Sequence, residues 1–177
     1  MAAKFEKVSR FEKHNFVMPH RMTTGSAGYD FVAAEDTIVP ALSNVMGNAA
    51  FAFAEGPLSM EAIAELTKRT KCKPTLVSTG VKCRLDKGTY LKLVNRSSNP
   101  LKYWLILING EGVIDTDYYN NPDNEGEIYF QFINLSPWDI IINKGDRIGQ
   151  GIIEPYLITE DDDAQGTRTG GLGSSGR

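Results

Sequence analysis

Residues 104–118 read Trp-Leu-Ile-Leu-Ile-Asn-Gly-Glu-Gly-Val-Ile-Asp-Thr-Asp-Tyr, and this stretch decides which fold we expect. Its first five residues form a short apolar run that is typical of a buried strand. The turn signal Asn109–Gly112 comes next, so the order of apolar run, glycine turn and second apolar run predicts a β-hairpin. Asp115 and Tyr118 follow it: a carboxylate can act as a general base, and a ring can stack on a ligand. On these residues alone, a surface hairpin with solvated carboxylates is the better interpretation.

The rest of the chain also predicts β-structure. Beyond Leu76, short segments that alternate apolar and polar residues are separated by glycine turns, which predicts an all-β sandwich or jelly roll. The further strands that we expect are 29–33, 81–85, 90–94, 128–133, 138–142 and 147–153. Residues 4–20 fit either a short helix or a first strand.

The composition is that of an ordinary globular chain of 177 residues, most simply one domain. The net charge of −3 carries no basic excess, so we expect no direct binding of nucleic acid. No apolar stretch is long enough for a membrane span and the N-terminus does not resemble a signal peptide, so we expect a cytoplasmic protein without membrane contact. The two cysteines make no disulfide framework, and Cys83, in an alternating run, is expected to be buried.

Five segments of the chain resemble, in this order, the motifs of a known family: Ala27–Phe31 with Ala33–Asp36, Arg96–Ser98, Asn109–Tyr118, Lys144–Gln150, and Arg168 with Gly170–Gly176. Each is weak alone, and together they are similar to the trimeric deoxyuridine triphosphate nucleotidohydrolases, the dUTPases. The resemblance implies an all-β fold, a distorted jelly roll or β-barrel, over residues 1–158. It also implies a flexible C-terminal arm over residues 159–177, and it covers nearly the whole chain except an insert at about 41–75.

The insert and the arm have their own local signals. Ser59 can cap a helix that runs from Met60 to about Lys71 and has its apolar residues on one face. We expect this helix to pack on the outside of the barrel, and the alternative is a partner-binding or regulatory element. In the arm, residues 159–167 are too polar to fold alone, whereas Arg168 and the glycine N–H groups after it can wrap a phosphate.

As a member of this family, the chain would hydrolyse dUTP to dUMP and pyrophosphate with Mg²⁺, which limits uracil incorporation into DNA and supplies dUMP for dTMP synthesis. The resemblance makes Asp115 the base that orients water onto the α-phosphorus, and Tyr118 the ring that packs on the deoxyribose. It places Asp30 near the Mg²⁺ ion, through water, and pairs Asp30 with Arg147. The substrate-binding residues that it implies are Arg96, Ser97, Ser98, Asn109, Val113, Ile114, Tyr118, Tyr129, Gln150, Arg168, Leu172, Gly173 and Ser174.

The resemblance also implies a homotrimer with shared active sites, in which the arm closes over the site of a neighbouring subunit. The chain departs from the usual pattern at Leu172, where phenylalanine commonly stacks on uracil, and the spacing from Arg168 is one residue short. The segment Tyr119–Glu125 extends a loop near the sugar, and Asp117 is expected to be structural.

Two other functions stay open on the sequence. A dCTP deaminase shares the fold and an Arg-Ser-Ser motif, and Glu127 is a glutamate that such an enzyme would need. Asp115, Tyr118 and the glycine-rich fifth motif favour hydrolysis at phosphorus instead. The second alternative is a dUTPase-like protein that binds a regulatory protein partner through the 41–75 insert.

Overall fold

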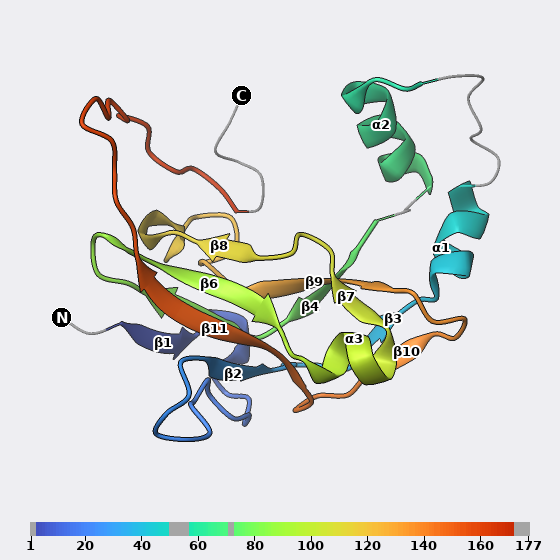
Figure 1. Cartoon of the computed structure of the whole chain (residues 1–177), viewed down its shortest axis with the longest axis horizontal. Coiled ribbons are helices and arrows are strands. Elements are labelled where there is room, and N and C mark those ends of the chain that lie inside the picture. The colour runs from blue at the N-terminus through green and yellow to red at the C-terminus, as the bar shows by residue number, and fades with distance from the viewer. Residues whose placement is uncertain (1–2, 50–56, 71–72, 172–177) are drawn as a thin grey trace.

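The computed structural model describes residues 3–49, 57–70 and 73–171 of the chain. It contains a four-stranded sheet in the order β2-β11-β6-β8, a three-stranded sheet in the order β4-β9-β7, and the two-stranded pairs β1-β5 and β10-β3 (Figure 1). All these pairings are antiparallel. The strands are β1 Lys4–Lys7, β2 Tyr29–Val32, β3 Thr37–Val39, β4 Thr75–Ser78, β5 Val81–Arg84, β6 Thr89–Asn95, β7 Leu105–Leu107, β8 Gly112–Ile114, β9 Tyr129–Asn134, β10 Ile140–Ile142 and β11 Arg147–Pro155.

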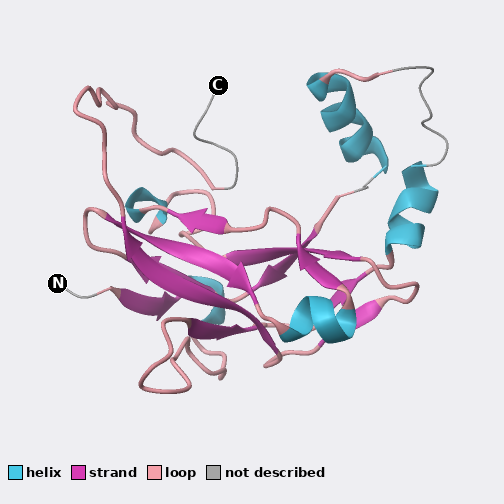
Figure 2. Cartoon of the chain, in the orientation of Figure 1, coloured by secondary structure: helices cyan, strands magenta, loops and turns pink. Residues whose placement is uncertain are grey.

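One hydrophobic core joins the sheets, and large side chains fill it. Phe31 of β2, Leu91 of β6 and Phe130 of β9 are each 0% exposed. A Cβ atom at Gly149 would lie 1.9 Å from the ring of Phe130, so β11 needs glycine where it crosses that ring. Cys83 of β5 is also in this core, as its alternating run predicts. Strands predominate over helices among the regular elements of the described chain (Figure 2), and the expected all-β fold of the jelly-roll type is confirmed.

The predicted hairpin over residues 104–118 is wrong in its pairing. Its two strands form, but β7 pairs with β9 and β8 pairs with β6, so they lie in different sheets. The link between them carries the chain from one sheet to the other, and Gly110 in it has a φ of +69°. A local turn signal shows where the chain bends, whereas the partner of each strand depends on distant residues.

The helices differ most from the expectation. The α1 helix Leu42–Ala49, the α3 helix Ser98–Tyr103 and the short 3₁₀ helix η3 Thr116–Tyr118 are elements that the pattern did not predict. The short 3₁₀ helix η1 Ser9–Phe11 lies where a short helix or a first strand was expected. Trp104, expected to begin a strand, instead has a φ of 56° and ends α3, where its N–H donates to the carbonyl oxygen of Asn99. Residues 4–20 prove to contain both a first strand and a turn of 3₁₀ helix.

The described part of the insert contains two helices, where one was expected. The α2 helix Met60–Thr70 begins where predicted, and the hydroxyl of Ser59 accepts the N–H of Ala62 at 3.2 Å as its N-cap. The expected packing on the barrel is not found: Met60 is 81% and Ile63 48% exposed. Figure 1 shows α2 standing off the sheets, above α1. Within the described ranges, no helix is long and apolar enough to cross a membrane.

Candidate active site

The functional segment Gly112–Tyr118 leaves the sheet at the end of β8. Ile114 is 6% exposed and Val113 60% exposed, because neighbouring residues of a strand point to opposite faces. Asp115 follows in an extended conformation and precedes η3, whose last residue is Tyr118. The Tyr118 side chain is buried, at 4% exposure, and burial raises the pKa of its hydroxyl. The strand and the short helix together hold a half-exposed carboxylate beside a fixed ring.

The arm returns to this same segment. The Arg168 guanidinium donates from Nη2 to Asp115 Oδ2 at 2.6 Å and from Nε to Asp117 Oδ1 at 2.9 Å. It also lies 5.6 Å from the centre of the Tyr118 ring, within the range of a cation–π contact. These contacts leave the Arg168 side chain 12% exposed, while the Asp115 side chain keeps 48% of its surface open to solvent. Arg168 and Asp115, far apart in sequence, therefore form one cluster.

The loop Tyr119–Gly126 holds the tyrosine hydroxyl from behind. Tyr118 Oη donates to the carbonyl oxygen of Glu127 at 2.8 Å and accepts from Asn124 Nδ2 at 2.8 Å. Asn121 in turn donates to Asn124 Oδ1 at 2.7 Å and to the Tyr118 carbonyl oxygen at 2.9 Å. A Cβ atom at Gly126, whose φ is +80°, would lie 2.5 Å from the Tyr118 carbonyl oxygen, so the loop can close this tightly only with glycine there.

A second cluster lies on β2 and β11. Gln150 Nε2 donates to Asp30 Oδ1 at 2.8 Å, and Arg147 Nη1 donates to Asp30 Oδ2 at 3.2 Å. The Asp30 side chain is 5% exposed, so these two partners compensate a buried carboxylate. The pairing of Asp30 with Arg147 that the resemblance implies is therefore present within one chain.

The Arg-Ser-Ser motif adjoins this second cluster. Arg96 Nη1 donates to the carbonyl oxygen of Arg147 at 2.9 Å, and both arginines line a cleft of about 350 Å³. Ser97 is exposed at the start of α3. Among the described residues, Ser98 Oγ is a buried side-chain atom that lacks a hydrogen-bond partner. Such a hydroxyl costs about 1–3 kcal/mol when left unpaired, which a ligand oxygen could recover.

The two clusters sit at opposite ends of β6. Ile114 is paired with Leu91, so Asp115 lies level with Tyr90, whereas Arg96 follows the last residue of β6. At ~3.3 Å per residue, the six steps from Tyr90 to Arg96 separate them by about 20 Å along the strand. One chain thus presents two half-sites: the Asp115 half-site, with Tyr118 and Arg168, and the Arg96 half-site, with Ser97, Ser98, Asp30, Arg147 and Gln150.

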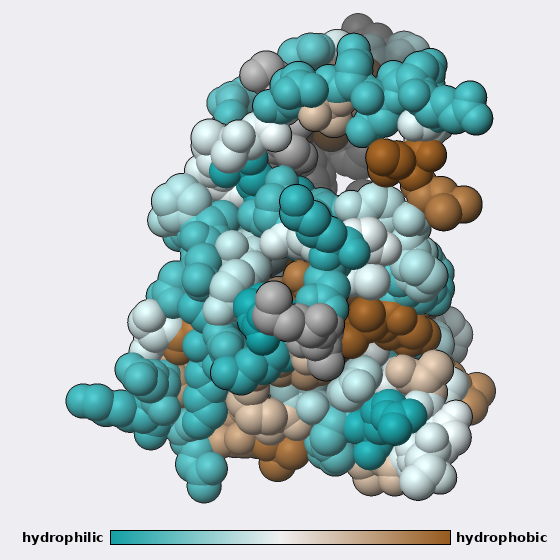
Figure 3. Space-filling model, turned by 90° about the vertical axis from the view of Figure 1, so that its left-hand side faces the viewer, coloured by the Kyte–Doolittle hydropathy of each residue, from teal (hydrophilic) through white to brown (hydrophobic). Residues whose placement is uncertain are grey.

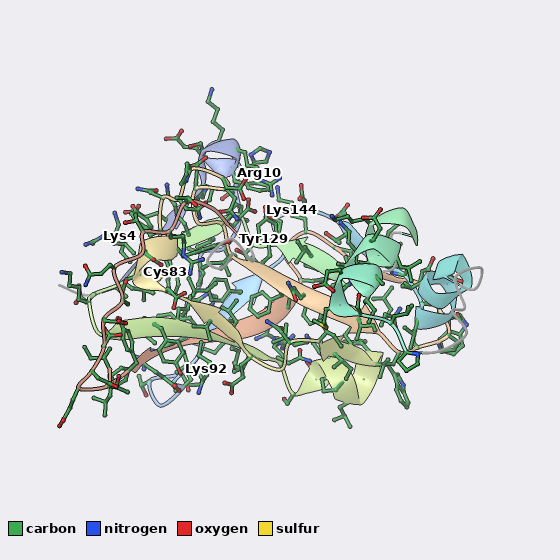
Figure 4. All side chains as sticks on the ribbon, turned by 90° about the horizontal axis from the view of Figure 1, so that it is seen from above. Lys4, Arg10, Cys83, Lys92, Tyr129 and Lys144 are labelled. Atoms are coloured by element: carbon green, nitrogen blue, oxygen red, sulfur yellow. The ribbon has the colours of Figure 1, made fainter. Side chains whose placement is uncertain are left out.

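Tyr129 and Glu127 belong to neither half-site. Glu127, with 3% of its side chain exposed, accepts from Arg10 at 2.8 and 3.0 Å and from Tyr129 Oη at 2.7 Å, and Ser78 also donates to it. Figure 4 shows Arg10 on the N-terminal turn with Tyr129 close beneath it. Burial and the bond to Glu127 raise the pKa of Tyr129, and the same carboxylate raises the pKa of Arg10. This network ties the N-terminal segment to β9.

The side chains present set limits on a metal site. No group of three His, Cys, Asp or Glu side chains that could hold an ion occurs in the described part of the chain. Both Asp30 oxygens already accept hydrogen bonds, which leaves only their remaining lone pairs for a metal-bound water. The donors therefore suit an ion that keeps most of its water and binds phosphate oxygens, as Mg²⁺ does.

Several predicted residues remain to be placed. Asn109 is exposed in the link between β7 and β8, and Leu172, Gly173 and Ser174 lie outside the described residues. Three residues that contact the site are not among those predicted from the sequence. Asp117 accepts from Arg168, which also binds Asp115. Asp123 accepts the N–H of Gly171 at 3.2 Å, and Asn124 donates to Tyr118 Oη. The unusual length of the Tyr119–Glu125 loop was the available signal for the last two.

The end of the molecule that carries the arm is mostly hydrophilic, with separate hydrophobic patches (Figure 3). A charged, open surface of this kind suits a polar ligand better than an apolar one.

Comparison with known proteins gives matches that span most of the chain. The family model described as dUTPase matches residues 58–176. The deoxyuridine 5'-triphosphate nucleotidohydrolase of Lactococcus lactis is 38% identical over 174 residues, which cover 97% of this chain and 96% of that protein. The crystal structure of dUTPase from Streptococcus mutans is similar with a TM-score of 0.66 at 34% identity, covering 88% of this chain and 98% of that one. A mutant dUTPase from phage phi11 of S. aureus, which coordinates a structural Mg(II) ion, shares the fold with a TM-score of 0.60 at 18% identity, over 94% of this chain and 98% of that one. The chain belongs to the dUTPase family.

Proposed function

We propose that this chain hydrolyses dUTP to dUMP and pyrophosphate. The observation that carries the proposal is the Asp115 half-site: an exposed carboxylate beside the buried Tyr118 ring, with a phosphate-binding cation, Arg168, at the same place. Membership of the dUTPase family and the names of the relatives support it. Such an enzyme would act on free nucleotides in the cytoplasm. A net charge of −3, without a basic excess, suits a free nucleotide better than nucleic acid.

In the proposed reaction, a water molecule attacks the α-phosphorus and gives its proton to the Asp115 carboxylate. The bond from the α-phosphorus to its bridging oxygen breaks, and pyrophosphate leaves with the electron pair. Tyr118 packs on the deoxyribose and leaves no room for a 2′-hydroxyl, because its ring is held rigidly from behind. Val113, Ile114 and Asn109 read the uracil edge, where a site built from hydrogen bonds rejects other bases.

The Arg96 half-site holds the phosphates in this proposal. Arg96, Ser97 and the unpaired Ser98 hydroxyl supply donors for phosphate oxygens, and Gln150 lies beside them on β11. Arg168 takes the γ-phosphate when the nucleotide binds. Mg²⁺ bound to the triphosphate would neutralise charge that develops on the leaving pyrophosphate, and Asp30 would reach it only through water.

The separation of the half-sites supports shared sites in a homotrimer. Because Asp115 and Arg96 lie about 20 Å apart along β6, one chain does not bring both to the same phosphate. In a closed ring, the Asp115 half-site of one chain can meet the Arg96 half-site of the next.

A pyrophosphate-release assay tests the function. Each deoxynucleoside triphosphate and UTP is supplied alone, with and without Mg²⁺, to the wild type, to Asp115→Asn and to Asp161→Asn, a matched change at an exposed arm residue. We expect turnover with dUTP and Mg²⁺ only, retained in Asp161→Asn and lost in Asp115→Asn. Ammonia released from dCTP would instead identify a deaminase. The Glu127 carboxylate already accepts hydrogen bonds from Arg10, Ser78 and Tyr129, which argues against a role in deamination.

The insert supports a second candidate function, the binding of a regulatory protein. Two residues of the apolar face of α2 are exposed in the chain, Met60 at 81% and Ile63 at 48%. Deletion of residues 41–75, followed by the same turnover assay, separates this role from catalysis: an unchanged rate would leave the insert free for a partner.

A further inference from the structure

The backbone of Glu127 holds both groups that bind the Tyr118 hydroxyl. Its carbonyl oxygen accepts that hydroxyl at 2.8 Å, and its N–H donates to the carbonyl oxygen of Asn124 at 3.0 Å. Asn124 in turn donates from its side chain to the same hydroxyl at 2.8 Å. The place of the Tyr118 ring therefore depends on where the Glu127 backbone lies.

The Glu127 side chain is fixed by Arg10, which lies 117 residues earlier in the chain. The guanidinium donates from Nε to Oε2 at 3.0 Å and from Nη2 to Oε1 at 2.8 Å, so it binds both carboxylate oxygens at once. Because the Glu127 side chain is 3% exposed, its charge needs a cation beside it, and Arg10 supplies that cation. Ser78 and Tyr129 add neutral donors to the same carboxylate.

Neighbours of Arg10 hold the loop over residues 119–126 at both ends. Ser9 donates to Glu125 Oε2 from its N–H at 3.1 Å and from its hydroxyl at 2.8 Å. At the other end, the hydroxyl of Tyr119 donates to the Glu6 carboxylate. The N-terminal segment 6–10 thus fixes the loop that holds Tyr118 from behind.

We propose that Arg10 is a positioning residue for the choice of sugar: through Glu127 it keeps the Tyr118 ring where a 2′-hydroxyl would clash. The inference rests on the proposed function, in which Tyr118 packs on the deoxyribose. A 2′-hydroxyl adds only one oxygen atom, so a ring free to shift by about 1 Å would make room for it. Discrimination against ribose therefore needs a ring that is held firmly as well as one that is present.

Arg10→Met tests this role, because methionine keeps much of the side-chain length and loses every donor. The Arg10 side chain is 48% exposed, so the change opens no cavity in the core. Its control is Lys13→Met, which removes a positive charge from an exposed residue nearby. The ratio of kcat/KM for dUTP to kcat/KM for UTP should fall about 5-fold in Arg10→Met and stay constant in Lys13→Met. A wild-type ratio in Arg10→Met would overturn the proposal.

The Tyr118→Phe background separates positioning from a general structural effect. It lacks the hydroxyl that Glu127 and Asn124 bind, so adding Arg10→Met there should lower the ratio no further. A second fall of the same size would show that Arg10 acts by another route, and the proposal would be wrong.

Amide hydrogen exchange without nucleotide gives a readout that needs no turnover. Peptides covering residues 118–127 should exchange about 5- to 10-fold faster in Arg10→Met than in Lys13→Met, while peptides of β6 and β11 should exchange equally in both. Equal exchange over residues 118–127 would overturn the positioning role. A wild type that fails to hydrolyse dUTP would instead contradict the proposed function, which the exchange data do not depend on.

A second variant covers a failure of Arg10→Met to fold, since that change leaves the buried Glu127 charge without its cation. Arg10→Met combined with Glu127→Gln has no such charge and still lacks the two-point contact. The same fall in the ratio is expected for it, and a wild-type ratio would again overturn the proposal.

Discussion

The guanidinium of Arg168 donates a 2.6 Å hydrogen bond to the carboxylate of Asp115, although the two residues are 53 positions apart in the sequence. One is the proposed phosphate-binding cation and the other the proposed base. Without nucleotide, the proposed base Asp115 is therefore ion-paired with Arg168. A bound triphosphate has to compete with Asp115 for the Arg168 guanidinium.

Asp115→Asn should abolish turnover and keep nucleotide binding. An amide is nearly isosteric but cannot take a proton, and loss of a general base costs about 10²–10⁴-fold in rate. The change also removes the charge that Arg168 meets, so affinity for dUMP should be unchanged or slightly higher. Pyrophosphate release and calorimetric dUMP binding give the two values. A variant with more than half of the wild-type turnover would exclude Asp115 as the base.

Arg168→Ala should lower turnover more than it lowers affinity. The guanidinium fixes the terminal phosphate, and poor placement of a reacting group costs about 10²-fold in rate, whereas the base and sugar contacts are untouched. The kcat and KM for dUTP are compared with those of Lys87→Ala, a change at an exposed residue of the β5–β6 turn. Should KM rise while kcat stays constant, Arg168 would serve binding only.

Asn124→Ala should weaken the discrimination between dUTP and UTP. Tyr118 Oη would lose the donor at 2.8 Å that holds its ring against the deoxyribose position. Loss of one such bond is worth about 1 kcal/mol, so the ratio of the two kcat/KM values should fall about 5-fold.

Two controls make that test specific to the ring. Asn15→Ala, at an exposed position, should leave the ratio unchanged. Tyr118→Phe removes the hydroxyl itself, and adding Asn124→Ala to it should produce no further loss of discrimination. A fall in thermal stability with an unchanged ratio would assign Asn124 a structural role alone.

We expect burial of Cys83 to make the folded protein less stable as the pH becomes alkaline. Burial raises the pKa of its thiol from 9.0 to about 12. The unfolded chain therefore releases this proton first, so the stabilisation is complete below pH 9 and is lost as the pH rises towards about 12. The free energy of unfolding is measured by urea titration between pH 8 and 11, in a Cys72→Ser background with and without Cys83→Ala. We expect the Cys83 protein to lose up to about 1 kcal/mol per pH unit more than the alanine variant; equal slopes would contradict it.

The sequence by itself determined the class of the fold and the family, and it named the candidate residues of the site. Period-two alternation located the strands that became β5, β6, β9 and β11, because burial of one face of a sheet imposes that pattern. Ser59 marked the first turn of α2, because its hydroxyl accepts the backbone N–H of Ala62. The order of five short motifs, each contained in a few consecutive residues, was sufficient to identify the family.

Only the tertiary structure decided which of these segments meet. The turn at Gly110 predicted that β7 and β8 pair, but the competition among all strands placed them in different sheets. Asp117, Asp123 and Asn124 became partners of the site through contacts with Arg168, Gly171 and Tyr118. The α2 helix shows the same limit: its amphipathic pattern predicted an apolar face but did not specify a surface to cover it. Local patterns report the conformation of a segment, whereas pairing across many residues depends on the free energy of the whole packed chain.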